Sequence, residues 1–153
     1  MKMRNVALTI LTVLAGLALS FASPMMGTWK LNEEKSKIPA GATKNNTVVY
    51  EVSGDSIKCT IDGTDAQGKP THVEWTGKFD GKDYPLTGDA TADMRAYKKV
   101  NDRTYEGVTK KDGKVLGTSR IVVAADGKSR TVTTEATNAE GKKTKTVAVY
   151  DKQ

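Results

Sequence analysis

Short β-rich runs with one polar and one apolar side alternate with glycine turns along most of the chain. Period-two alternation is clearest where Ile57, Cys59 and Ile61 alternate with polar residues, and it recurs around Trp75 and Phe79. Such alternation is typical of strands with one solvated face. Glycine-containing turns, with one Asn101-Asp102 turn among them, follow one another mostly at intervals of about 11 to 14 residues, with no helical period between them. The pattern therefore predicts an antiparallel meander joined by tight hairpins.

We expect eight or nine strands, rich in the β-branched residues threonine and valine that suit a pleated surface. They are predicted at residues 27–31, 47–53, 56–62, 71–79, 94–100, 104–110, 115–124, 130–136 and 143–150. A meander of this many strands removes its exposed edges most economically by closing on itself. The predicted fold class is therefore all-β, a single up-and-down antiparallel meander closed into a barrel.

Two segments do not follow the strand pattern. Residues 32–46 could hold a short helix with Asn32 as its cap, or they could form a plain loop. Residues 84–89 contain proline and glycine and are predicted to be a loop, packed on the barrel mouth through Tyr84 and Leu86.

The first residues have the layout of a secretory signal peptide. Basic Lys2 and Arg4 precede an uncharged apolar run and a small-residue stretch that ends at Ala22. The run is about 14 residues long, too short to span a membrane, and no second apolar run follows. We expect a signal peptide over residues 1–22, cleavage after Ala22 and one domain over residues 23–153, located in the periplasm or secreted.

The net charge of +6 comes from lysines that are interspersed with acidic residues. This distribution predicts a solvated mixed-charge surface, and without a basic stripe nucleic acid is not an expected partner. Weak contact of this surface with anionic polymers of the cell envelope is a possible interaction. The single cysteine, Cys59, cannot form an internal disulfide and is predicted to be a buried, unreactive thiol.

Residues for catalysis and metal binding are sparse. The only histidine is His72, and no Gly-x-Ser-x-Gly elbow is present to hold a serine nucleophile. His72 and Glu74 share one strand face, but a third metal ligand is not evident. The segment before Lys69 has the spacing of a phosphate-binding loop, yet Pro70 stands where a serine or threonine is required. We expect no enzymatic activity, no metal and no cofactor.

The start of the predicted domain resembles known ligand-binding barrels. Gly27, Thr28 and Trp29 are similar to the Gly-x-Trp signature on the first strand of lipocalins and fatty-acid-binding proteins, and residues 147–150 resemble the last strand of the latter. The chain from residue 23 onward also looks like a group of small exported bacterial proteins of unknown function. The resemblance implies a lipocalin-like barrel in which Trp29 closes one end, often beneath a basic side chain, with Gly27 in a structural role.

The same resemblance raises the question of an anion anchor. Fatty-acid-binding proteins hold a carboxylate with an arginine two residues before a tyrosine on the last strand, but here Ala148 precedes Tyr150. Arg95 and Tyr97 have that spacing on an earlier strand, and Arg120 lies among apolar residues. Either arginine could be an internal anchor.

The residues predicted to face inward are bulky in the first half of the chain and small in the second half. The small ones leave room for a ligand unless the large ones opposite fill it. Our hypothesis is a non-enzymatic barrel that binds a small, mostly apolar ligand; the alternative is a structural or interaction protein of the cell envelope with a filled barrel. The candidate ligand contacts are Tyr50, Trp75, Phe79, Arg95, Tyr97, Gly117 and Arg120.

Overall fold

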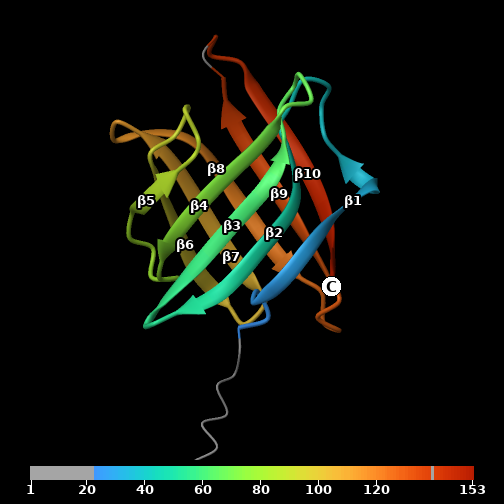
Figure 1. Cartoon of the computed structure of the whole chain (residues 1–153), viewed down its shortest axis with the longest axis vertical. Helices are drawn as coiled ribbons and strands as arrows, with labels where there is room; N and C mark the ends of the chain where they lie inside the picture. Colours follow the sequence, from blue (N-terminus) through green and yellow to red (C-terminus); the bar gives the residue numbers. More distant parts are fainter. Residues whose placement is uncertain (1–22, 139) are drawn as a thin grey trace, which may run out of the picture.

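A computed structural model describes residues 23–138 and 140–153, so the expected signal peptide, residues 1–22, lies outside the described residues. Figure 1 shows an all-β, closed antiparallel barrel. Its ten strands are β1 (Gly27–Lys37), β2 (Lys44–Ser53), β3 (Ser56–Thr64), β4 (Pro70–Gly77), β5 (Tyr84–Thr87), β6 (Met94–Asn101), β7 (Thr104–Lys111), β8 (Lys114–Val123), β9 (Ser129–Thr137) and β10 (Lys143–Lys152).

Each strand pairs with its neighbours in chain order, and the barrel closes where β1 pairs with β10. Trp29 stands at this junction, opposite Lys152 on β10 and opposite Val48 on β2. The predicted up-and-down meander is confirmed, with ten strands rather than eight or nine. No helix in residues 23–138 or 140–153 is long and apolar enough to cross a membrane.

The helix or loop expected over residues 32–46 is wrong at both ends, because β1 extends to Lys37 and β2 begins at Lys44. The pairing of β1 with β10 runs through a register shift between Asn32 and Lys37. Ser36 bridges the irregularity, because its hydroxyl donates to the Asn32 carbonyl at 2.6 Å and accepts the Val149 N–H at 2.9 Å. The Ser36 side chain therefore takes the place of backbone hydrogen bonds between the two strands. The sequence pattern could not show such a contact.

The predicted loop at residues 84–89 contains the additional strand, β5. Leu86 pairs with Trp75 on β4, and Tyr84 pairs with Arg95 on β6. Leu86 is buried, at 5% exposure. A strand of four residues is too short to show alternation, and Pro85 within it argues against a strand in sequence terms.

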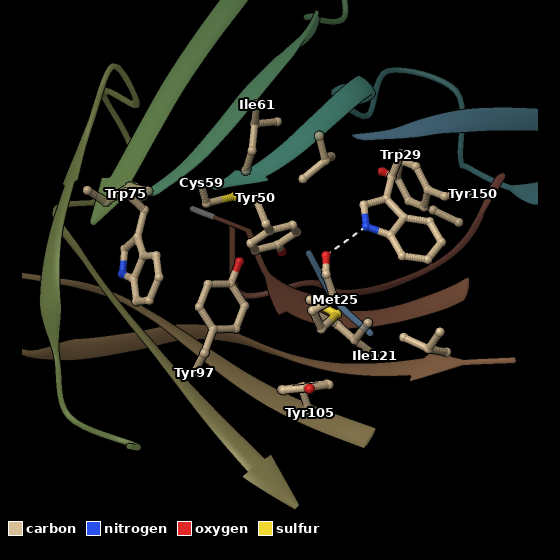
Figure 2. Packing of buried hydrophobic residues seen from close by; sticks show 14 of the residues in the cluster. Met25, Trp29, Tyr50, Cys59, Ile61, Trp75, Tyr97, Tyr105, Ile121 and Tyr150 are labelled. Atoms are coloured by element: carbon tan, nitrogen blue, oxygen red, sulfur yellow. Dashed lines mark hydrogen bonds between the residues drawn. The ribbon is translucent and has the colours of Figure 1, made fainter. Parts of the chain in front are cut away.

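The first described residues close one end of the barrel. Met25 and Trp29 are both fully buried, and the Trp29 indole N–H donates to the Met25 carbonyl at 2.9 Å (Figure 2). The Ser23 hydroxyl is hydrogen-bonded to the Tyr105 hydroxyl, which links the first described residues to β7. This end of the barrel is therefore filled by side chains.

Five aromatic side chains fill another part of the interior. Trp75 stacks on Phe79 at 6.3 Å between ring centroids and meets Tyr97 edge to face at 4.9 Å. Phe79 in turn meets Tyr105 at 5.1 Å, and Tyr84 meets Trp75 at 5.9 Å. Such offset and edge-to-face contacts add to the stabilisation that burial provides. This cluster thus joins large residues of β4, β5 and the segment between them to Tyr97 of β6 and Tyr105 of β7.

Candidate functional site: an interior cavity

The barrel encloses a cavity of about 680 Å³. One wall consists of β8 and β9, where the inward positions carry small side chains. Gly117 pairs with Ala136, and Ser119 pairs with Thr134, so small residues face small residues across the two strands. The barrel diameter is set by strand number and tilt, and side chains this short leave the centre open.

The opposite wall and the deep end of the cavity are mostly apolar. Val48 and Tyr50 of β2 and Ile61 of β3 face Ile121 of β8 and Val132 of β9. Their register explains the grouping, because Val48 pairs with Ile61 and Ile121 pairs with Val132. A ligand in this part of the cavity would exchange water for aliphatic and aromatic surface.

Polar side chains mark the other end of the cavity, where the connections between strands meet. Asn45 is the second residue of β2, Asp89 and Thr91 lie between β5 and β6, Lys114 begins β8, and Asn138 follows β9. The Asp89 carboxylate is engaged locally, since it accepts the backbone N–H and the hydroxyl of Thr91. The cavity therefore runs from an apolar interior to a polar mouth.

Arg130 is the most deeply buried charged side chain in the described residues, at 3% exposure, and it lines the cavity. Its guanidinium carbon lies 4.9 Å from the centroid of the Trp29 ring, 5.3 Å from that of Tyr50 and 4.8 Å from that of Tyr150. Cation–π attraction to three rings offsets part of the cost of burying the charge. Two basic side chains therefore lie over the Trp29 ring, Arg130 and Lys152.

The hydrogen-bonding capacity of Arg130 is poorly used. One terminal nitrogen donates to the Met25 sulfur at 3.7 Å, a weak acceptor, the Tyr50 hydroxyl lies close enough to the guanidinium to take part in hydrogen bonding, and the Nε–H has no partner within the described residues. Sequence reasoning missed this residue, although a signal existed. Thr134 and Ala136 are predicted to face inward, and Arg130 has the same parity on that strand.

Arg95 on β6 also lines the cavity and is half-buried. Its Nε–H donates to the Thr109 hydroxyl at 3.2 Å, and a terminal nitrogen donates to the Tyr97 hydroxyl at 3.5 Å. Both acceptors are hydroxyl groups. No carboxylate in the described part of the chain forms a salt bridge with Arg95 or Arg130.

Three buried acidic groups that interact with these arginines stay protonated at neutral pH. Burial raises the pKa of Tyr150 to about 12 and that of the Cys59 thiol to about 11. Burial also raises the pKa of Tyr50 well above its usual range, although Arg130 opposes the shift. The positive charge of the two guanidinium groups therefore has no anionic counterpart among these neighbours.

Four of the seven predicted ligand contacts line the cavity: Tyr50, Arg95, Tyr97 and Gly117. Trp75 and Phe79 face inward as predicted, but they belong to the aromatic cluster and not to the cavity wall. Alternation determines which face of a strand a residue occupies. It does not determine the depth along the barrel axis at which space remains open.

Arg120 lies on the outer surface, which corrects the suggestion that it anchors an anion inside. Its side chain is 56% exposed and forms a salt bridge of 3.0 Å with Glu106 on β7. The reason is parity, because Ser119 and Ile121 on either side of it face the interior. Ile121 beside Arg120 is apolar because it points into the barrel, away from the face of β8 that carries Arg120.

The two residues with predicted structural roles lie at the closed end. Gly27 has a φ of +104°, a conformation that favours glycine, and a Cβ there would stand 3.2 Å from the Lys152 side chain. Trp29 is fully buried between Arg130 and Lys152, whose ammonium nitrogen lies 5.2 Å from the centroid of its ring.

The polar cluster around His72 lies on the outside of β3 and β4. His72 is hydrogen-bonded to Asp62 and within 3.5 Å of Glu74, and these hydrogen bonds raise the pKa of its imidazole. All three side chains are exposed. Within residues 23–138 and 140–153, no three His, Cys, Asp or Glu side chains are arranged to hold a metal ion.

Comparison with known proteins adds no assignment to this geometry. No protein-family model matches the chain, and no curated protein matches it.

Proposed function

We propose that this protein is an exported, non-enzymatic barrel that binds a small, mostly apolar molecule in its interior. The observation that carries the proposal is the cavity of about 680 Å³. Packed protein interiors contain few voids larger than a water molecule, whereas ligand pockets typically measure about 300 to 1,000 Å³. An open interior of this size also argues against the alternative of a barrel filled by its own side chains.

The proposal includes a relationship to the lipocalin-like, or calycin, barrels. Its support is the closed end, where Trp29 of the first strand lies beneath a basic side chain, Arg130. The closed antiparallel barrel is consistent with that relationship.

Binding can be tested with N-phenyl-1-naphthylamine, an uncharged apolar dye whose fluorescence increases in apolar surroundings. Thr134→Phe places a ring in the cavity and should weaken dye binding about tenfold or more by occupying ligand space. The matched control is Thr133→Phe on the same strand. Thr133 pairs with the outward-facing Arg120, so this variant should bind the dye normally.

Two results would contradict the proposal. One is the absence of dye binding by the unaltered protein. The other is equal weakening by Thr133→Phe and Thr134→Phe, because a dye bound to the outer surface would not distinguish the inner from the outer position.

Export is tested separately. If residues 1–22 are a signal peptide, the protein recovered from the periplasm or the medium should begin at Ser23, as measured by intact-mass spectrometry. Recovery of the full-length chain from the cytoplasm alone would contradict this part of the proposal.

A further inference from the structure

We propose that the ligand enters and leaves the cavity through an opening in the side of the barrel, between β8 and β9, and that the Leu116 side chain closes this opening. The inference rests on the proposed function, because it assumes that the cavity takes up a ligand. It adds the route by which the cavity exchanges that ligand with the surroundings.

The first observation is that the pairing of β8 with β9 stops before either strand does. The last pair joins Gly117 to Ala136, although β8 begins at Lys114 and β9 ends at Thr137. The first three residues of β8 therefore have no partner on β9. Moving them away from β9 breaks no pair of the ladder, so this is the place where the two strands separate most easily.

The second observation is a bulge in β8 at the same level. Thr109 of β7 pairs with Gly117, but the next residue, Lys110, pairs with Val115, so Leu116 is left without a partner on β7 as well. A bulge of this kind bends the strand that carries it. The Leu116 side chain is partly buried and packs against the core. This part of the wall therefore depends on one side chain and not on backbone pairing.

The third observation is a groove of about 370 Å³ on the outside of this wall, which we call the outer groove. Its rim includes Glu135 and Lys145, whose side chains are 67% and 63% exposed. Successive residues of an intact strand face opposite sides of the sheet. Here, in contrast, six residues border both the cavity and the outer groove: Val115, Leu116, Gly117, Thr118, Ala136 and Thr137. Such shared lining indicates that the two spaces meet between β8 and β9.

The chemistry of the opening suits an apolar ligand better than the polar mouth does. Val115, which is 51% exposed, and Leu116 provide aliphatic surface along the side route. At the mouth, a ligand would instead displace water from groups such as the Asn45 amide and the Asp89 carboxylate. Contact with aliphatic surface is favourable, whereas desolvation of polar groups without replacement of their hydrogen bonds is costly. The side route therefore has the lower barrier.

The route can be tested by measuring the rates at which the barrel binds and releases N-phenyl-1-naphthylamine in stopped-flow fluorescence. Thr137→Phe places a ring at the opening and should slow both rates about fivefold or more, because an obstacle on the route raises the barrier in both directions. The Kd should change by less than about twofold. The matched control is Asn45→Phe, since Asn45 is also exposed and lines the cavity but does not border the outer groove. It should leave both rates within about twofold of those of the unaltered protein.

A second variant tests the role of Leu116. Leu116→Ala removes the side chain that closes the opening and should raise both rates about fivefold or more. Its control is Val132→Ala, because Val132 is also partly buried and lines the cavity but lies away from the outer groove. Circular dichroism verifies that each variant is folded. Should Leu116→Ala fail to fold, the substitution at the exposed Thr137 still decides.

The outcomes separate this inference from the proposed function. Unchanged rates in Thr137→Phe overturn the inference and leave ligand binding intact. Equal slowing by Thr137→Phe and Asn45→Phe also overturns it, because the dye would then pass through the mouth as a whole. If the dye does not bind to the unaltered protein, the proposed function and the inference fail together.

Discussion

Replacing Trp29 by alanine should strongly destabilise the barrel, because this side chain fills the closed end. Trp29 is fully buried, its indole N–H donates to the Met25 carbonyl at 2.9 Å, and Arg130 lies over its ring. Truncating a buried tryptophan to alanine costs about 3 to 5 kcal/mol. With a urea m-value of about 2 kcal/mol/M, the unfolding midpoint should fall by about 2 M.

A second substitution keeps the test informative if the alanine variant does not fold. Trp29→Phe retains an aromatic ring but leaves the buried Met25 carbonyl without its donor, which costs about 1 to 3 kcal/mol. The expected order of stability is therefore unaltered protein, Trp29→Phe, then Trp29→Ala. The control is Val52→Ala, since Val52 is 73% exposed and its truncation should change stability by no more than about 0.5 kcal/mol.

Unfolding should be followed by far-ultraviolet circular dichroism, because the substitutions at Trp29 remove one of only two tryptophans and alter the fluorescence signal. A loss below about 1 kcal/mol in Trp29→Ala would refute the reasoning. It would mean that the ring is not needed to close the barrel. A loss in Val52→Ala equal to that in Trp29→Ala would show that the experiment does not report burial.

Further predictions concern individual side chains. Cys59 is fully buried and burial raises its pKa to about 11, so Ellman's reagent at pH 8 should react with it only after denaturant is added; rapid reaction of the folded protein would contradict its burial. His72 should titrate above pH 6.5 by NMR, and Asp62→Asn should lower its pKa; the stabilisation from this contact is then greatest below pH 6.5 and is lost as pH rises through the folded-state pKa. Gly117→Ala should destabilise by about 1 to 3 kcal/mol in urea, because its Cβ would stand 2.8 Å from the Glu135 carbonyl oxygen, and a neutral result would show that β8 and β9 can separate.

The parts of the fold that depend on local pattern could be predicted from the sequence. Alternation placed Tyr50 and Trp75 inward, and glycine turns located most of the hairpins. The strand β5 was missed because four residues with an internal proline carry too little pattern. The extension of β1 beyond Leu31 was missed because its irregular pairing is completed by the Ser36 side chain.

The candidate site was less predictable, because a cavity depends on register between strands that are distant in sequence. That Gly117 lies opposite Ala136 follows from the pairing of β8 with β9 and not from either strand alone. Alternation of inward and outward positions could have excluded Arg120 from the cavity and identified Arg130 as a cavity residue, since both lie on strands whose inward positions had been assigned. The depth of Trp75 and Phe79 along the barrel had no sequence signal.

The junction between β1 and β10 constrains how the chain can fold. Trp29 and Lys152 pair at this seam although they are on the order of 120 residues apart in sequence, and contacts between distant residues form slowly. Until the seam forms, the sheet has two open edges whose N–H and C=O groups can pair with another chain. A polypeptide interrupted before Lys143 would lack β10 and keep the edges of β1 and β9 open permanently. Self-association through those edges is the outcome that incomplete synthesis or proteolytic loss of the last strand would favour.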